Sequence, residues 1–239
     1  MGAACCTCGW GHSISQVMRR WTCLIFVVTV VGCASPETGS PKNASNLPDL
    51  PDNREEGLLL LMADRRYYDS FTVGSIRLDN PELGVPLASA LGRIGDSRGI
   101  PTLQTLLVEG RPEVRREAAF ALGAIDDPEV VRYLLAALTD SDTETAVWAV
   151  AGLADHQVEL ARVAKSLERL SPTEKWQRLS PYLFRFPASQ ILPMAPEGLG
   201  IQHHEVQAMV VFALARDPQL EAVDMLRSQI GHRDPWVQG

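Results

Sequence analysis

The residues of this chain that could do chemistry are few, and the most suggestive are an adjacent histidine and glutamate, His204 and Glu205. Imidazole and carboxylate groups are common ligands of transition metals. The corresponding places in earlier segments read Pro81-Glu82, Pro112-Glu113 and Thr143-Glu144. A single His-Glu pair supplies too few ligands for a metal centre, so we expect a solvated helix start with the glutamate near the positive end of the helix dipole. The sequence therefore predicts no metal site and no cofactor.

Other catalytic signatures are missing from the sequence. It contains no Gly-x-Ser-x-Gly nucleophile motif, no Gly-rich phosphate-binding loop and no His-Glu-x-x-His zinc motif. Every cysteine lies at or before Cys33, so the rest of the chain has no thiol nucleophile or thiolate ligand. We expect no catalytic residue and no small-molecule substrate.

Two charged groups recur or cluster, and both have a structural explanation. Aspartates stand at similar places in successive segments, where we expect them to cap helices; they are Asp96, Asp127, Asp155 and Asp217. The tight basic group of Arg111, Arg115 and Arg116 is interleaved with Glu113 and Glu117. This pattern indicates a solvated and partly self-paired helix face.

Composition places these residues in a globular chain. Of 239 residues, 46% are hydrophobic and 21% are charged, which is enough apolar material for a sizeable core. Acids outnumber bases by 29 to 22, for a net charge of −7. The bases are spread along the chain, so a nucleic-acid partner is not expected.

The N-terminal segment has the pattern of an export signal. Arg19 and Arg20 precede an apolar run over residues 21–31, which is too short for a bilayer-spanning helix of about 20 residues. The run leads into Gly32-Cys33 and resembles a bacterial lipoprotein signal over residues 1–32, with the true start possibly at Met18. The resemblance implies a membrane partner through acyl chains on Cys33 and a place in the bacterial cell envelope, at the outer membrane if there are two. The alternative is an ordinary signal peptide or a short membrane anchor with an incidental cysteine.

Two regions follow the leader. Residues 33–53 are rich in Pro, Asn and Ser without apolar periodicity, which predicts a flexible tether. Residues 54–239 form a repeat with a period of about 31 residues. In each unit, two apolar stripes at helical spacing predict a pair of helices; examples of the first stripe are Leu83, Leu87, Ala90, Leu91 and Ile94, then Val114, Ala118, Ala121, Leu122 and Ile125. Gly92 and Gly123 fall inside these helices, where we expect close approach of a neighbouring helix.

Residues 88–96 and 119–127 carry the signature Ala-x-Ala-Leu-Gly-x-Ile followed by Gly-Asp or Asp-Asp. They resemble short HEAT repeats of the type named after phycobilisome lyases. The resemblance implies an all-α fold, a right-handed α-solenoid of helix pairs whose second helices line the concave face, and it implies binding more than catalysis. A tetrapyrrole lyase is one alternative. Deoxyhypusine hydroxylases are similar HEAT-repeat enzymes and hold a di-iron centre through several His-Glu pairs, of which this chain has one.

One unit, residues 172–202, departs from the repeat. It is rich in proline, which interrupts helices, and in aromatic residues, which often anchor protein interfaces; the aromatic residues are Trp176, Tyr182, Phe184 and Phe186. We predict that these four side chains bind a partner. The alternative is that they fill core space left by irregular packing.

The functional interpretation follows from these parts. We expect a membrane-tethered HEAT-repeat scaffold that binds a protein partner in the bacterial envelope. The sequence Asp234-Pro235-Trp236-Val237 repeats the opening of a unit, so the array is expected to be truncated at the C-terminus. The alternative is the repeat region of a larger envelope enzyme, a cyclophilin-type peptidyl-prolyl isomerase with its catalytic domain beyond Gly239.

Overall fold

A computed structural model describes residues 54–76, 80, 82–216 and 220–229 of the chain. Within these residues all regular structure is helical and no strand occurs, as the sequence predicts. The leader, Cys33 and the tether lie outside the described residues. No helix in the described part of the chain combines the length and apolar character needed to span a membrane.

The helices pair into units, each with a first and a second helix. The first helices are α2 (Arg54–Arg65), α4 (Gly84–Ile94), α6 (Pro112–Gly123), α8 (Thr143–Asp155) and α13 (His204–Arg216). The second helices are α3 (Ser70–Ser75), α5 (Ile100–Glu109), α7 (Val130–Ala137), α9 (Leu160–Ser166) and α14 (Leu220–Gln229). Short elements fill the remainder: the 3-10 turns η1 (Ser97–Gly99) and η2 (Ser180–Arg185), and the helices α10 (Pro172–Leu179), α11 (Ala188–Ile191) and α12 (Ala195–Gly200).

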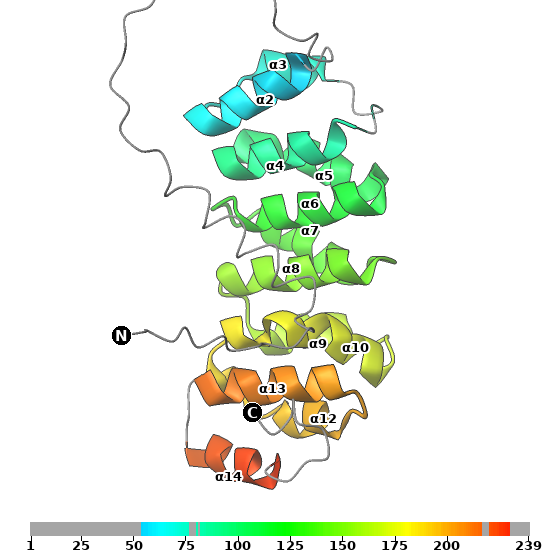
Figure 1. The fold of residues 1–239 in the computed structure, drawn as a ribbon, viewed down its shortest axis with the longest axis vertical. Helices are drawn as coiled ribbons and strands as arrows, with labels where there is room; N and C mark the ends of the chain where they lie inside the picture. The colour runs from blue at the N-terminus through cyan, green and yellow to red at the C-terminus, as the bar shows by residue number, and fades with distance from the viewer. Residues whose placement is uncertain (1–53, 77–79, 81, 217–219, 230–239) are drawn as a thin grey trace, which may run out of the picture. The chain divides into compact units, whose positions relative to one another are not determined.

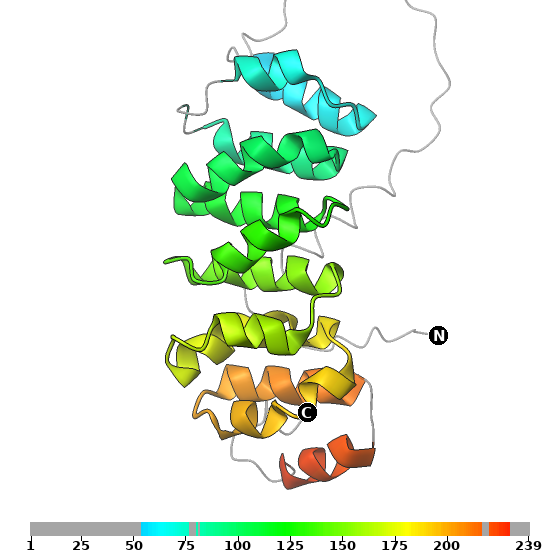
Figure 2. The same ribbon diagram turned by 180° about the vertical axis from the view of Figure 1, so that it is seen from behind.

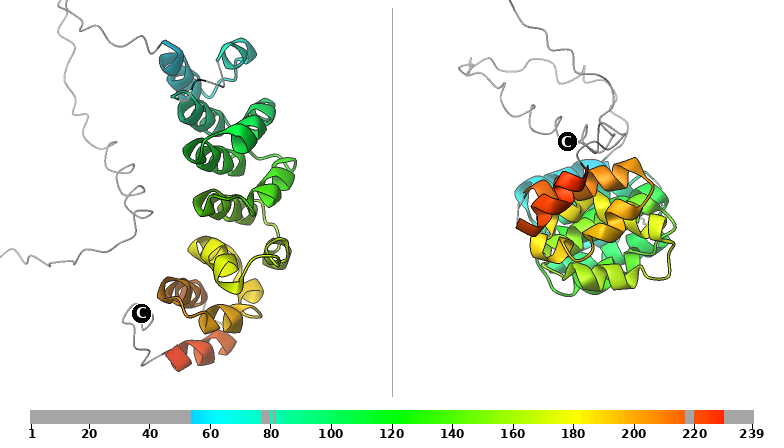
Figure 3. Two further views of the ribbon diagram at one scale, coloured as in Figure 1. Left: turned by 90° about the vertical axis from the view of Figure 1, so that its right-hand side faces the viewer. Right: turned by 90° about the horizontal axis from the view of Figure 1, so that it is seen from below.

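The units stack into an α-solenoid. Along the first-helix row, α4 packs against α2 and α6, and α6 packs against α8 (Figure 1). The view from behind shows the second helices (Figure 2), and the side view separates the two rows (Figure 3). Two second helices also support the next first helix, since α5 contacts α6 and α7 contacts α8.

The apolar stripes expected from the sequence form the core. In α4, Leu87, Ala90 and Leu91 are buried, and in α6 and just after it Val114, Ala118, Ala121, Leu122 and Ile125 are buried too. The second helices bury Leu103, Leu106 and Leu107 in α5 and Leu134 in α7. Because the stripes recur at helical spacing in every unit, the predicted helix pairs over the regular repeats are confirmed.

Glycines set the spacing of the first helices. A Cβ atom placed on Gly92 would lie 2.8 Å from Cα and Cβ of Ala121, and one on Gly123 would lie 2.8 Å from Cα of Gly152. Backbones that approach this closely leave no room for a side chain. The expected reason for Gly92 and Gly123 is therefore confirmed, and Gly152 continues the same contact.

The unit over residues 172–202 is irregular, as its prolines predict. It contains α10, η2, α11 and α12 in place of two long helices. Prolines stand at the start of these elements, where their missing N–H costs little; Pro172 opens α10, Pro181 lies in η2 and Pro196 opens α12. Nevertheless η2 still contacts α8 on one side and α13 on the other, so the stack continues through this unit.

The capping prediction holds for Asp96 and is wrong for Asp127 and Asp155. Asp96 caps η1 by accepting a hydrogen bond from the backbone N–H of Arg98. Asp127 accepts a hydrogen bond from the backbone N–H of Glu129 in the turn before α7, but the N-cap of α7 is Glu129. Asp155 instead ends α8 and forms an ion pair with Arg185. Asp217 lies outside the described residues. Asp142 is a cap that the repeat pattern missed, and it precedes α8.

Candidate functional site

The four aromatic residues predicted to bind a partner differ in exposure. Trp176 is fully buried, and Tyr182 and Phe186 are each 5% exposed. Phe184 is partly buried and packs against the core. A Cβ atom on Gly198 would lie 2.7 Å from the Trp176 ring, so the indole is enclosed by α12. Burial of this kind favours the core-filling alternative for Trp176, Tyr182 and Phe186, and leaves Phe184 as the most exposed of the four.

Five aromatic side chains form a continuous row across four units. We call Phe120, Trp148, Tyr182, Phe184 and Phe212 the aromatic row. Successive ring centroids lie 5.1, 5.3, 6.1 and 5.7 Å apart, in tilted or edge-on arrangements. These separations and angles are those that aromatic pairs prefer. The row runs from α6 through α8 and η2 to α13, along the first helices.

The two ends of the aromatic row are open to solvent. Phe120 is 43% exposed and Phe212 is 45% exposed, whereas Trp148 and Phe184 are partly buried. Phe120 precedes Ala-Leu in α6, and Phe212 precedes Ala-Leu in α13, so they occupy the same place in units three apart. Exposed phenylalanines at one repeat position indicate a shared surface more than accidental exposure.

Arginines of the chain itself cover the middle of the row. The guanidinium of Arg185 lies 4.9 Å from the Tyr182 ring centroid, and that of Arg216 lies 5.3 Å from the Phe184 centroid. Both distances are within the range of cation–π attraction. The Tyr182 hydroxyl is buried without a hydrogen-bond partner among the described residues. Burial raises the pKa of this phenol to about 12.

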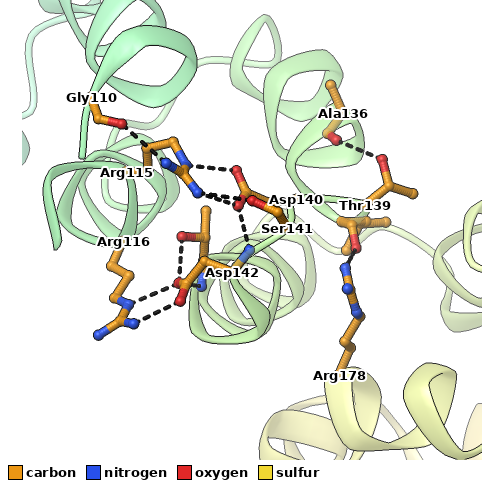
Figure 4. Close-up of polar contacts among 11 residues, drawn as sticks. Gly110, Arg115, Arg116, Ala136, Thr139, Asp140, Ser141, Asp142 and Arg178 are labelled. Atoms are coloured by element: carbon orange, nitrogen blue, oxygen red, sulfur yellow. Dashed lines mark hydrogen bonds and ion pairs between the residues drawn. The ribbon is translucent and has the colours of Figure 1, made fainter. Parts of the chain in front are cut away.

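Ion pairs between units hold the first helices in place (Figure 4). Arg115 donates from Nε and Nη2 to the carboxylate of Asp140, at 2.9 and 2.8 Å. Arg116 donates in the same way to Asp142, at 2.8 and 2.6 Å, and its Nη1 lies 2.8 Å from Glu144. The sequence predicts a solvated and partly self-paired face for these arginines, whereas the carboxylates that they bind lie beyond α6, in the turn before α8 and in its first turn.

A second candidate is a hollow beside α7. It has a volume of about 720 Å³ and lies between α7 and the connection from α8 to α9, with Val131, Arg132, His156 and Arg162 in its wall. Arg132 is already paired with Glu129 and Tyr133. The hollow is wide open and brings no acid, base and nucleophile together, so it supports a function less well than the aromatic row.

The described residues around the His204-Glu205 pair do not form a metal centre. His204 and Glu205 are exposed in the first turn of α13. His203 stacks on His204 with ring centroids 5.8 Å apart, and its Nε2 lies 3.2 Å from the Gln177 amide nitrogen. Among the described residues, no three His, Cys, Asp or Glu side chains gather closely enough to hold a metal ion.

Comparison with known protein families identifies the central repeats. A family model described as HEAT repeats matches residues 76–154. These residues are HEAT repeats. The match covers the units from α4 to α8, in which the signature sequences and the contacting glycines lie.

Two curated proteins match part of the chain. Deoxyhypusine hydroxylase from Bos taurus is 46% identical over 70 residues, and the enzyme from Homo sapiens is 44% identical over 70 residues. Each match covers 28% of this chain and 23% of the relative, so the matched segment spans less than a quarter of those proteins. The structure of human deoxyhypusine hydroxylase in complex with glycerol aligns with a TM-score of 0.39 and 22% identity, over 80% of this chain and 77% of that one.

These matches overturn several sequence-based expectations. The relatives are hydroxylases by name, so the interpretation of the chain as a lipid-anchored scaffold of the bacterial envelope is wrong, and so is the alternative of a cyclophilin-type isomerase. The membrane partner and the envelope location fall with it. The expectation of no small-molecule substrate is contradicted as well, because the matched relatives are named as enzymes. Cys33, on which the lipid anchor depended, lies outside the described residues.

Sequence reasoning missed most of the aromatic row. Phe120 and Trp148 lie in regular units, and the search for aromatic clusters along the chain favoured the dense group around Tyr182. A signal was available, because Phe120 and Phe212 align when the repeats are superposed. Aligning the repeats with one another identifies residues that come together when units stack. A high local content of aromatic residues identifies only residues that belong to the same unit.

Proposed function

We propose that this chain is a protein-recognition module of HEAT repeats that binds a polypeptide segment along its first helices. The observation that carries the proposal is the aromatic row with its exposed ends, Phe120 and Phe212. Aromatic side chains supply large contact areas with little loss of conformational freedom and dominate many protein interfaces. We assign the repeats to the short, phycobilisome-lyase type because of the signature in residues 88–96 and 119–127, and we assign the array to residues 54–239.

Selection from a random displayed peptide library tests this proposal with the full chain as bait. Peptides enriched on the unmodified chain should lose their enrichment on the double variant Phe120→Ser with Phe212→Ser. Both residues are nearly half exposed, so the double variant should fold normally. Phe71→Ser is the matched control, because Phe71 is 83% exposed and lies on the second helix α3.

Two results would contradict the proposal. One is equal enrichment on the unmodified chain and the double variant, which would remove the row from the binding surface. The other is an equal loss in the Phe71→Ser control, which would show that peptides adhere to any exposed phenylalanine. Thermal unfolding of all three proteins checks that the comparison is made between folded chains.

The match to deoxyhypusine hydroxylases favours a second candidate, a hydroxylase-like activity that would require a metal. The chain supports it poorly, because the described residues offer no cluster of metal ligands. Metal analysis of the purified chain distinguishes the candidates. Stoichiometric iron that is lost in the His204→Ala variant would favour the hydroxylase, and iron at background level would favour the recognition module.

A further inference from the structure

We infer that the segment bound along the aromatic row is positively charged and presents lysine or arginine side chains to the first helices. This inference rests on the proposed function and specifies the chemistry of the partner. It is carried by glutamates that share a helix face with the rings, by arginines that already occupy two rings, and by the charge of the chain.

Each first helix that carries an exposed or partly exposed ring also carries a glutamate in its first turn. Glu113, Glu144 and Glu205 begin α6, α8 and α13, and we call them the glutamate row. All three side chains are exposed. Glu113 precedes Phe120 by seven residues and Glu205 precedes Phe212 by seven, while Glu144 precedes Trp148 by four. With 3.6 residues in each helical turn, these spacings place acid and ring on the same face.

Carboxylates and aromatic rings both attract cationic side chains. A carboxylate pairs with ammonium or guanidinium, and the negative face of a ring attracts the same groups. The chain shows this directly, because Arg185 and Arg216 already lie over Tyr182 and Phe184. Phe120 and Phe212 are exposed, and no arginine lies over either ring in the described part of the chain. These two end rings therefore remain available to a partner.

Internal ion pairs neutralise part of the acid on this face. Arg116 is engaged by both Asp142 and Glu144, and Arg185 is paired with Asp155, whereas Glu113 and Glu205 form no ion pair within the described part of the chain. Glu117, one turn from Phe120 in α6, adds a further carboxylate to the same face. Glu113, Glu117 and Glu205 are thus carboxylates without an ion pair among the described residues, and Arg216, which lies over Phe184, is a cation on the same row. Complementary charge on a partner would be attracted to these carboxylates.

Two other occupants fit this charge less well. Residues 33–53 of the chain contain Glu37, Asp49 and Asp52 against the single base Lys42, so this segment is acidic. A second copy of the chain carries a net charge of −7 and would bring the same acidic face. Like charges placed opposite each other disfavour both arrangements.

Repeat geometry sets the expected spacing of the basic residues. Packed helices lie about 8–10 Å apart, and an extended chain advances about 3.3 Å per residue. An extended segment crossing the first helices therefore meets a new helix about every third residue. We expect basic residues at that spacing to bind best.

Synthetic peptides test the inference directly. The probe is a fluorescent peptide of Arg-Ser-Gly repeated four times, compared with Glu-Ser-Gly repeated four times and with a peptide of the first composition whose arginines are clustered at one end. Fluorescence anisotropy with the full chain should show binding of the spaced basic peptide, weaker binding of the clustered peptide and none of the acidic peptide. Binding should weaken as salt is raised, because exposed charges are screened.

Charge-neutralising variants locate the site. The double variant Glu113→Gln with Glu205→Gln should raise the Kd of the spaced basic peptide about fivefold. Glu109→Gln is the matched control, since Glu109 is an exposed glutamate at the end of the second helix α5, and it should leave the Kd unchanged. Equal binding of basic and acidic peptides, or equal effects of the two sets of variants, overturns the inference.

The same experiments separate this inference from the proposed function. If library peptides without basic residues bind and are lost in the Phe120→Ser with Phe212→Ser variant, the recognition function stands and the positive charge of the partner is wrong. If the basic peptide binds equally well to that phenylalanine variant, charge alone holds it and the inference about the aromatic row is wrong.

Discussion

At the scale of single residues, Tyr182 and Asp142 show opposite ways of placing a polar group in the interior. Tyr182 buries a hydroxyl that has no hydrogen-bond partner among the described residues. Asp142 is also largely shielded, with 15% of its side chain exposed, yet it accepts hydrogen bonds from Arg116 and from Thr145. A buried polar group costs free energy unless its hydrogen bonds are made, so these two residues should respond differently to substitution.

Tyr182→Phe should raise the free energy of unfolding by about 1 kcal/mol, because it removes a buried hydroxyl that gains no hydrogen bond in the folded state. The ring and its neighbours Trp148 and Phe184 stay in place. Urea unfolding measures the change. Tyr133→Phe serves as the control, because the Tyr133 hydroxyl has contacts with Arg132 and Glu129. Removing this hydroxyl should not raise the free energy of unfolding. A loss of stability in Tyr182→Phe would show that its hydroxyl has a partner.

Asp142→Asn should destabilise the chain at neutral pH and have little effect in acid. The Arg116 guanidinium, followed by the N–H and hydroxyl of Thr145, holds the pKa of Asp142 well below its usual range. A carboxyl whose pKa is lower in the folded state stabilises that state fully at pH values above its unfolded pKa of about 4. This stabilisation is lost as the pH falls toward and through the lower pKa of the folded state. Asparagine keeps the helix cap but not the charge. Thermal unfolding at pH 7 and at about pH 2 should show the difference between variant and parent shrinking.

At the scale of helices, the close contacts of the first-helix row depend on glycine. Gly123→Ala would place a methyl group 2.8 Å from Cα of Gly152, which forces the two helices apart. Overpacking of this kind costs about 1–3 kcal/mol and outweighs the gain of about 1 kcal/mol that alanine gives inside a helix. We therefore expect Gly123→Ala to lower the midpoint of urea unfolding.

Gly57→Ala is the matched control for this prediction. Gly57 lies inside α2, and no atom would come within 4 Å of an added Cβ. Helix propensity acts alone there, so the substitution should raise the free energy of unfolding by about 0.5–1 kcal/mol. Opposite signs for the two substitutions support the assigned contact, and equal signs contradict it.

The helices were predictable from sequence where one unit repeats the next. The helical spacing of the apolar residues is visible in the sequence, for example at Leu87, Leu91, Ala118 and Leu122. Glycines inside these helices indicate a close contact with a neighbouring helix. The links between units were not predictable in the same way. Arg116 and Asp142 pair across a turn and a helix, and the sequence does not specify how far one unit rotates against the next. For Trp176 the sequence left interface and core as alternatives, because an irregular unit has no neighbour with which to compare it, and the structure buries the residue.

At the scale of the molecule, the stack divides stability among neighbouring units. Leu122 is fully buried in the last turn of α6, and Leu122→Ala should cost about 2–5 kcal/mol by opening a cavity. Because each unit of a repeat protein contacts only its neighbours, the damage should stay local. Hydrogen exchange should speed up in α4, α6 and α8, while α13 keeps its protection. Uniform acceleration throughout the chain would show that the array unfolds as a single cooperative unit.

The glycine contacts also set how the stack can deform. Where Gly123 meets Gly152, backbone touches backbone, and no flexible side chain can be compressed between them. The array therefore resists compression along the first-helix row. When it bends, the units rotate about this row and the second helices move apart or together. Phe120 and Trp148 stand about one turn from those glycines, close to the axis of rotation. A flexing array would therefore keep its rings at nearly constant spacing while its opposite side opens and closes.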